Sequence, residues 1–287
     1  MKATIILPTT ADRGALLKYS ADSALRQIVR EIELFVVGDG VNDETRNAVE
    51  KLMEKDSRVS FFDFDKHPRR GEPYRHQVLR DEASGEIVCY LCDRDLMLSN
   101  HVAEIYQQLK THDIASTLNY WVQPDGTIFI VRVESLSELT GENRQIRHLS
   151  SVGHTLQAYK SLPYGWRTTP LEEQYTDIYM WNQFLEIKET RASIIPVPTI
   201  LYFNRGDHPG LPTPQRAKEL ETWYGKLIAE DGESKIHREC LCHIIRKNFE
   251  LADQVDAQRQ VLQKWITIRR KPPRLFLQKV LQKILRG

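Results

Sequence analysis

Long apolar runs are missing from this sequence of 287 residues. No segment approaches the roughly 18 apolar residues that a membrane-spanning helix needs. The apolar run at the N-terminus, residues 3–8, is too short for a signal peptide, and we expect it to be a strand. Internal repeats and low-complexity segments are absent as well, which argues against a repeat architecture or a disordered chain. The composition, 41% hydrophobic and 28% charged, predicts an ordinary globular protein.

Cysteine is scarce, with four residues at Cys89, Cys92, Cys240 and Cys242. Cys89 and Cys92 form a CxxC pair inside an apolar segment that predicts a strand. Residues three apart on a strand face opposite sides of the sheet, so this pair cannot easily share a zinc ion. We therefore expect buried free thiols in a reducing cytoplasm rather than a disulfide or metal site.

Acidic residues are missing after Asp256, where nine basic residues remain. Of the 40 lysines and arginines, 31 therefore precede that point, against all 39 acidic residues, which gives residues 1–256 a net charge of −8. A basic tail on an acidic body indicates an anionic partner for the tail. Nucleic acid is not expected, because the basic run is short and the body is acidic.

Strand and helix patterns alternate through the first third of the chain. Apolar runs predict buried strands, and the segments between them have helical spacing. This alternation is typical of a Rossmann-like, mostly parallel sheet with helices on its faces, an α/β fold. The predicted strands are residues 3–8, 32–37, 59–64 and 87–92, and the predicted helices are residues 14–30, 43–55 and 74–83.

Polar tripeptides follow three of these strands: Pro8-Thr9-Thr10, Gly38-Asp39-Gly40 and Asp93-Arg94-Asp95. The carboxyl ends of parallel strands meet at one edge of a sheet, where ligands bind in open α/β folds. Two carboxylates there could hold a hard divalent cation, which prefers oxygen ligands. The alternative is an acidic turn that caps a helix starting near Ser99.

The second half of the chain has a different pattern. Residues 113–122 and 127–133, joined by Gln123-Pro124-Asp125-Gly126, predict a β-hairpin. Residues 171–187 have helical spacing. The apolar segment 192–203 contains two prolines and favours an edge strand or an irregular ribbon. Residues 214–262 are helical in pattern, with an interruption near Asp231-Gly232.

The order of these motifs resembles family 2 glycosyltransferases, which have the GT-A fold. The matching features are Ile-Leu-Pro-Thr near the start, Val-Val-Gly-Asp-Gly followed by Asp43-Glu44-Thr45, Ala-Ser-Gly-Glu-Ile, and Asp93-Arg94-Asp95. The resemblance covers residues 3–110 well and continues loosely to about residue 210. It implies a GT-A domain over 1–210, with a nucleotide-binding half (1–97) and an acceptor-binding half (98–210). Residues 211–287 would form a C-terminal helical extension.

The resemblance also implies roles for individual residues. Asp39 would hydrogen-bond the base of a nucleotide sugar, and Pro8 and Thr9 would contact the same nucleotide. Asp93 would face the ribose or the sugar. Asp95 would ligate Mn²⁺ or Mg²⁺ at the diphosphate, and a late-loop histidine, His208, would complete the metal site.

Basic residues near these motifs depart from the family pattern. Arg94 stands between the two acids, where a small or acidic residue is more usual, and could reach the diphosphate. Arg69, Arg70 and Arg75 flank a polar loop and could pair with phosphate, or the loop could simply be solvated. Arg70 and Arg94 are the candidates for donor binding.

A catalytic base is expected in the second half, where the family has an acid followed by an aromatic-rich helix. Asp177 is the candidate, and Glu173, four residues earlier, is the alternative on the same predicted helix face. Trp166 lies in a predicted loop and is a candidate to stack on a sugar ring, although buried aromatic residues are commoner.

Residues 264–287 form a basic amphipathic pattern that could lie on an anionic membrane surface. Packing against the body of the protein or against a second subunit is the alternative, and the oligomeric state stays open. The predicted protein is a cytoplasmic glycosyltransferase, peripheral on the inner face of the plasma membrane if the tail binds there. It would invert the anomeric centre and transfer a sugar, from a UDP-linked donor for preference, to a glycan or lipid-linked acceptor. The alternatives are a nucleotidyltransferase-like enzyme and a non-catalytic GT-A protein that binds a partner through its tail.

Overall fold

The computed structural model describes residues 1–130, 148–173, 175–203 and 212–269. The chain divides into two compact units, Met1–His237 and Arg238–Gly287. The predicted domain boundary after residue 210 therefore falls inside the first unit. No helix in the described part of the chain is both long enough and apolar enough to span a bilayer.

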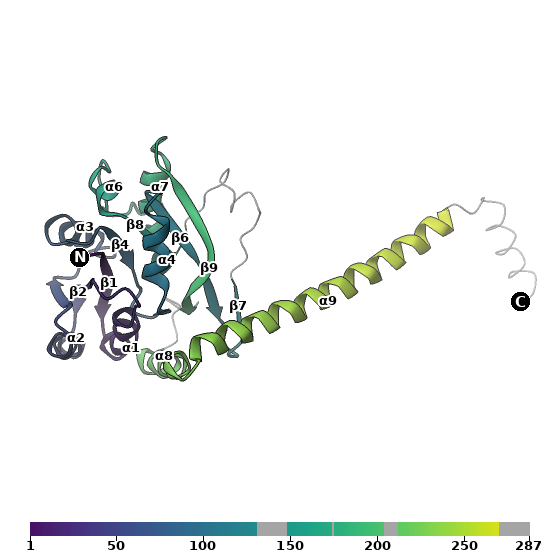
Figure 1. The fold of residues 1–287 in the computed structure, drawn as a ribbon, viewed down its shortest axis with the longest axis horizontal. Coiled ribbons are helices and arrows are strands. Elements are labelled where there is room, and N and C mark those ends of the chain that lie inside the picture. Colours follow the sequence, from purple (N-terminus) through teal and green to yellow (C-terminus); the bar gives the residue numbers. More distant parts are fainter. Residues whose placement is uncertain (131–147, 174, 204–211, 270–287) are drawn as a thin grey trace, which may run out of the picture. The chain divides into compact units, whose positions relative to one another are not determined.

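The first unit is built on one sheet of nine strands (Figure 1). The strand order is β3-β2-β1-β4-β8-β6-β9-β5, and β7 pairs with β6. Strands β1 to β4 pair in parallel, whereas β8 runs antiparallel to both β4 and β6. The strands are β1 (Ala3–Ala11), β2 (Ile32–Val41), β3 (Val59–Phe64), β4 (Ile87–Tyr90), β5 (Leu96–Met97), β6 (Ile114–Val122), β7 (Ile128–Ile130), β8 (Val152–Thr155) and β9 (Ala192–Phe203).

Helices cover both faces of this sheet, and each face has its own hydrophobic cluster. One cluster contains side chains of α1 (Gly14–Leu25), α2 (Asp43–Lys55) and α4 (His101–Gln108). The other contains side chains of α3 (Glu72–Asp81), α6 (Leu156–Lys160) and α7 (Thr176–Leu185). Successive residues of β4 alternate between the two clusters, as a strand buried on both faces requires. The predicted α/β architecture, with its mostly parallel first half, is confirmed.

The cysteines follow the same alternation. Cys89 belongs to the first cluster, while Cys92 packs against the second, so the two thiols face opposite sides of the sheet as predicted. All four cysteines are free. The expectation that all are buried is wrong for Cys242, which is exposed, and Cys92 is only partly buried.

The turn after β1 is fixed by a buried threonine of α2. The Thr45 hydroxyl donates to the Ala11 carbonyl at 2.7 Å and accepts from the Gly14 amide at 3.0 Å. The Thr45 amide in turn donates to the side chain of Asn42, the N-cap of α2, at 2.9 Å. One side chain therefore locks the turn from β1 into α1 against the start of α2.

Strand β9 bears out the irregular ribbon rather than a plain edge strand. It pairs in parallel with β6 along its length, and the register shifts around Leu118, opposite the segment that carries Pro196 and Pro198. Among the described residues, only Ile200 and Leu201 pair on its other side, with β5. The prolines thus lie where β9 has a single neighbour, so no ladder hydrogen bond is lost on the second side.

The predicted hairpin is confirmed, since β6 and β7 pair antiparallel.

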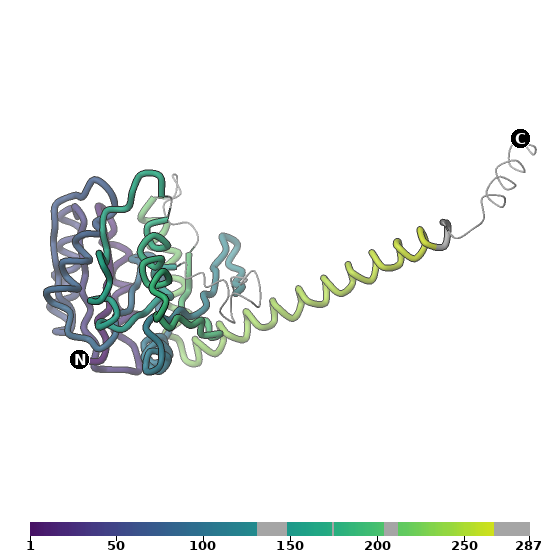
Figure 2. The backbone as a smooth tube through the Cα atoms, turned by 90° about the horizontal axis from the view of Figure 1, so that it is seen from above, coloured from purple at the N-terminus to yellow at the C-terminus, as the bar shows by residue number. Residues whose placement is uncertain are grey.

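Two helices follow β9: α8 (Thr213–Ile228) and α9 (Gly232–Arg269), with the break at the predicted position. Helix α8 buries Leu220, Trp223 and Leu227, and its Tyr224 ring lies 5.5 Å from the ring of Tyr19 on α1. The described part of the second unit is the continuation of α9, which is drawn as one continuous helix in Figure 2.

We predict that Thr45→Val destabilises the protein by about 2 kcal/mol, because the Ala11 carbonyl and the Gly14 amide then lose their shared hydroxyl partner. Urea unfolding measures the change. The matched control is Thr222→Val on α8, whose exposed hydroxyl bonds only its own helix, at the Lys218 carbonyl. An equal loss in both variants would contradict the assignment.

Candidate active site

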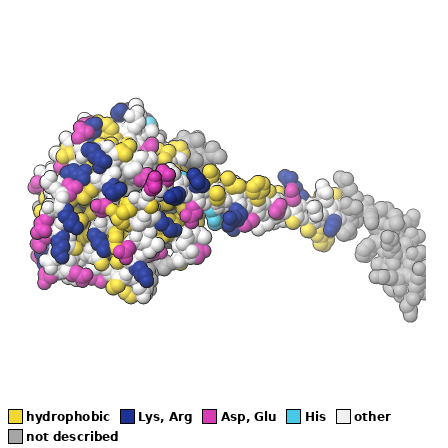
Figure 3. Space-filling model, turned by 60° about the horizontal axis from the view of Figure 1, so that its bottom comes forward, with side chains coloured by type: hydrophobic (Ala, Val, Ile, Leu, Met, Phe, Trp, Pro, Cys, Tyr) yellow, Lys and Arg dark blue, Asp and Glu magenta, His cyan; other side chains and the backbone are white. Residues whose placement is uncertain are grey.

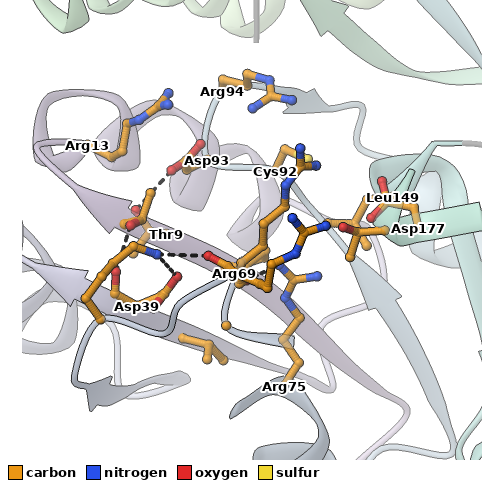
Figure 4. Close-up of a pocket in the computed structure, with 17 residues that line it drawn as sticks. Thr9, Arg13, Asp39, Arg69, Arg75, Cys92, Asp93, Arg94, Leu149 and Asp177 are labelled. Atoms are coloured by element: carbon orange, nitrogen blue, oxygen red, sulfur yellow. Dashed lines mark hydrogen bonds and ion pairs between the residues drawn. The ribbon is translucent and has the colours of Figure 1, made fainter. Parts of the chain in front are cut away.

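A pocket opens at the carboxyl ends of β1, β2 and β4 (Figure 4). Its lining brings together residues from both halves of the first unit. The predicted residues Pro8, Thr9, Asp39, Arg70, Asp93, Arg94 and Asp177 all line it. The pocket also includes Thr10, Arg13, Val37, Lys66, Arg69, Gly71, Arg75, Cys92, Leu149 and Thr176.

Asp39, at the end of β2, is almost fully buried. One carboxylate oxygen accepts from the His67 amide at 2.6 Å, and the other pairs with Lys66. Gly71 approaches closely: it has a φ of +65°, and a Cβ there would lie 2.9 Å from the Asp39 Cβ. Glycine is required at this position both for the left-handed backbone and for the space.

Glu72, the first residue of α3, anchors the loop that carries the pocket's basic side chains. Its carboxylate is fully buried and accepts from the backbone amides of Arg70 at 3.0 Å and Thr169 at 3.3 Å. Burial alone would raise the pKa of Glu72, but these hydrogen bonds outweigh it and lower the pKa. The charged form of Glu72 therefore ties this loop to the segment before α7.

Asp93 faces the pocket from the turn after β4. Its carboxylate accepts from the Thr9 hydroxyl at 3.0 Å, and its backbone carbonyl accepts from Ser20 of α1 at 3.2 Å. Strands β1 and β4 are neighbours in the sheet, which is why Thr9 and Asp93 meet although they are far apart in the sequence. The predicted convergence of the strand ends at one edge of the sheet is therefore present in the structure.

Asp95 does not line the pocket. One of its oxygens accepts from the Ser150 hydroxyl at 2.6 Å and the other from the Phe203 amide at 3.3 Å. The side chain is 1% exposed, and burial raises its pKa to about 6, with the Arg94 guanidinium opposing that rise. In this arrangement Asp95 connects the turn after β4 to the second half of the sheet.

The described residues do not form a preassembled site for a divalent metal ion. No group of three or more His, Cys, Asp or Glu side chains in that part of the chain is placed to hold a metal ion. Both oxygens of Asp95 are engaged by protein donors, and Arg94, between the two acids in the sequence, lines the pocket with Asp93. His208, the predicted third ligand, lies outside the described residues.

Asp177 enters the pocket from the first turn of α7. Burial raises the pKa of its carboxyl, while the guanidinium groups of Arg75, Arg94 and Arg70 and a hydrogen bond from the Leu149 backbone oppose the shift. Figure 4 shows Asp177 beside Leu149, in the same pocket as Arg75 and Arg94. A carboxylate whose pKa is raised by burial is a better proton acceptor than an exposed one.

Glu173, the alternative base, is exposed and does not line the pocket. The helix predicted over residues 171–187 begins only at Thr176. Glu173 therefore lies in the turn before α7, and the argument that it shares a helix face with Asp177 fails.

Trp166 is 2% exposed and cannot serve as an open platform for a sugar. Its indole Nε1 donates to the Tyr90 hydroxyl at 3.0 Å, which is bonded to His154 Nε2 at 2.7 Å. The His154 ring lies in this core with its pKa lowered to about 4 by burial. The expectation of sugar stacking is wrong because the Trp166 side chain turns inward and packs against Tyr90 of β4.

Sequence reasoning did not assign Arg13, Lys66, Leu149 or Cys92 to the pocket. Arg13 follows the end of β1, where polar pocket residues were expected, so its position in the sequence could have placed it in the pocket. Leu149 gave none, because it reaches the pocket through the pairing of β8 with β4.

The fold and the pocket define a class: enzymes of the GT-A type, which bind a nucleotide sugar at the carboxyl edge of a mostly parallel sheet. Solved structures support the fold. S. aureus TarS (residues 1–349) in complex with UDP-GlcNAc matches with a TM-score of 0.56 and 17% identity, over 84% of this chain and 70% of that one. The mannosyltransferase PcManGT from Pyrobaculum calidifontis, in complex with GDP-Man and Mn²⁺, matches with a TM-score of 0.55 and 15% identity, over 89% and 80%.

The chain belongs to glycosyl transferase family 2, whose model matches residues 4–160. A relative from Campylobacter jejuni, the GalNAc(5)-diNAcBac-PP-undecaprenol beta-1,3-glucosyltransferase, is 30% identical over 107 residues. That match spans 37% of this chain and 34% of the relative, about a third of its length. The predicted family and GT-A fold are confirmed.

We predict that Asp95→Asn stabilises the fold at neutral pH. The pKa of Asp95 is about 6 in the folded protein, above its ordinary value of 3.8. The folded state therefore favours the protonated carboxyl, and the charged carboxylate destabilises the fold above pH 6. The wild-type protein should gain stability from this group as the pH falls through 6, by at most about 3 kcal/mol.

Urea unfolding in EDTA checks this prediction at about pH 7.5 and about pH 4.5. Comparing variant with wild type cancels the other titrating groups. The stability advantage of Asp95→Asn should shrink by about 2 kcal/mol at the lower pH. If the stability advantage of Asp95→Asn were larger at about pH 4.5 than at about pH 7.5, burial would not be raising the pKa of Asp95.

Proposed function

We propose that this protein transfers a sugar from a nucleotide-diphosphate sugar to an acceptor hydroxyl with inversion at the anomeric carbon. The observation that carries the proposal is the meeting of Asp39, Asp93 and Asp177 in one pocket, each from a different element. Family membership supports the class of reaction. A nucleotidyltransferase is not favoured, because the family match covers the segment that contains these strand ends.

The reaction is a single displacement with Asp177 as the base. The acceptor oxygen attacks the anomeric carbon and forms the new glycosidic bond. The bond from that carbon to the diphosphate oxygen breaks, and the nucleoside diphosphate leaves with the electron pair. The acceptor proton passes to the Asp177 carboxylate, whose raised pKa improves it as an acceptor. Glu173 stays the alternative base only if the turn before α7 rearranges.

The nucleotide is assigned to the β1–β2 side of the pocket, with Pro8, Thr9 and Asp39. Asp93 faces the sugar portion, and Arg70 and Arg94 face the phosphates. Uridine is the preferred base: TarS was solved with UDP-GlcNAc, although PcManGT was solved with GDP-Man. The carboxylate of Asp39 is already paired with Lys66 and His67, so contact with a base requires one of these partners to yield.

A divalent cation, Mn²⁺ or Mg²⁺, stays a prediction of the family resemblance. Held by Asp95 and His208, as the resemblance implies, it would neutralise charge on the leaving diphosphate. Asp95 would first have to release Ser150 or Phe203. The Mn²⁺ of PcManGT is the finding that favours a metal.

The acceptor is proposed to be a glycan or lipid-linked sugar, since the Campylobacter relative is named for an undecaprenol-linked one. This proposal agrees with a cytoplasmic protein held at a membrane surface by residues 264–287. Exposed apolar side chains lie along α9 (Figure 3) and include Leu262, Trp265 and Ile266 near its end. The rest of the proposed membrane segment, residues 270–287, lies outside the described residues. A non-catalytic role through this tail is the remaining alternative.

We expect Asp177→Asn to reduce the rate of sugar transfer by about a hundredfold or more while donor affinity is preserved, because the amide cannot accept the proton. Transfer is measured by release of nucleoside diphosphate in the presence of acceptor. Glu173→Gln serves as the matched control and should keep near wild-type activity. The reverse pattern, an active Asp177→Asn and an inactive Glu173→Gln, would move the base to Glu173.

Removal of residues 264–287 should abolish sedimentation with vesicles that contain anionic lipid, since each basic residue near such a surface contributes about 1 kcal/mol. Neutral vesicles provide the control, and raised salt should release the intact protein. If the full-length protein did not sediment with anionic vesicles, the tail would have no membrane role.

A further inference from the structure

Arg75 on α3 is a buried cation with unused donors. Its side chain is 6% exposed, and Nη2 donates to the Arg70 carbonyl at 2.9 Å. Nε and Nη1 have no hydrogen-bond partner among the described residues. These two nitrogens carry three N–H donors between them.

The guanidinium of Arg75 is held in place by an aromatic ring. It lies over the Trp166 ring, 4.7 Å from the centroid. Trp166 is itself fixed, because its backbone amide donates to the Tyr159 hydroxyl at 3.1 Å and its indole donates to Tyr90. Such a support keeps the guanidinium in one orientation before any ligand arrives, which lowers the entropic cost of binding.

A buried charge with unpaired N–H groups is costly, and structures retain one where something else satisfies it. Arg75 lines the pocket, so its missing partner can come from a ligand there. Arg70 and Arg94 line the same pocket, and all three are the guanidinium groups that act on Asp177. The ligand group that this surrounding favours is an anion with several acceptor oxygens, close to the point of sugar transfer.

We propose that Arg75, together with Arg70 and Arg94, forms an anion subsite that binds the diphosphate of the donor without requiring a divalent cation. The inference rests on the proposed function for the identity of the donor. The subsite assigns a role to Arg94, whose charge beside two acids would otherwise weaken a metal site. The subsite also agrees with the position of Asp95, whose carboxylate accepts from Ser150 and Phe203 and does not line the pocket.

The test is calorimetric titration of the full chain with inorganic pyrophosphate and with UDP, both in EDTA. Wild-type protein should bind both ligands. Arg75→Met keeps the apolar stem over Trp166 but removes the donors, and should weaken both ligands by about tenfold or more. Arg75→Lys should recover little of this loss, because an ammonium group does not reproduce the placement of Nε and Nη1.

Two further variants keep the test decisive if Arg75→Met folds poorly. Arg70→Met removes an exposed cation of the same pocket and should weaken both ligands several-fold. Arg80→Met is the matched control: Arg80 is on the same helix, exposed, and paired with Asp81 outside the pocket. It should bind both ligands as the wild type does.

The proposal is overturned if wild-type protein fails to bind pyrophosphate in EDTA, or if Arg75→Met and Arg70→Met bind it normally. A third titration uses UDP-glucuronic acid in EDTA. The proposal is also overturned if Arg75→Met weakens binding of this ligand but not of UDP, since the subsite would then bind a sugar carboxylate. Arginine-dependent binding of pyrophosphate in a protein that transfers no sugar would uphold the subsite and refute the proposed function instead.

Discussion

The parallel pairing of β1 with β2 on one side and with β4 on the other is the constraint on which the site depends. The register places Thr10 opposite Asp39 and Ile6 opposite Tyr90, so the turns after all three strands open at one edge. Thr9 reaches Asp93 across this edge, and Thr45 locks the turn after β1. A slip of one residue would reverse the facing of every side chain and dissolve the pocket.

The pocket contains buried charges of both signs. Asp93 and Arg75 are each 6% exposed, and hydrogen bonds, neighbouring charges and the Trp166 ring support them and the half-buried Asp177. In a water-poor site such groups interact more strongly with developing charge than they would at the surface. In the proposed reaction the guanidinium groups of Arg70, Arg75 and Arg94 would face the phosphates and also lower the pKa of Asp177, so that anion binding and proton acceptance would depend on one arrangement.

Much of the first half could be predicted from sequence, because its signals are local. Continuous apolar runs predicted β1 to β4, and the polar strand ends predicted the positions of Asp39 and Asp93 in the pocket. Asp95 shows the limit: its orientation is decided by Ser150 and Phe203, more than fifty residues away in the sequence. Trp166 and Arg75 show the same limit, since a loop pattern does not reveal that the indole turns inward and supports a guanidinium.

We propose that this edge of the sheet binds a nucleotide-diphosphate sugar. Thermal unfolding of the full chain against UDP-glucose, UDP-GlcNAc and GDP-mannose, each with and without Mn²⁺, tests it most directly. A ligand that binds only the folded state raises the melting temperature, and the rise grows with the logarithm of ligand concentration. We predict such a rise with at least one uridine donor and none with the free sugars. No shift with any nucleotide sugar, in either metal condition, would contradict the account.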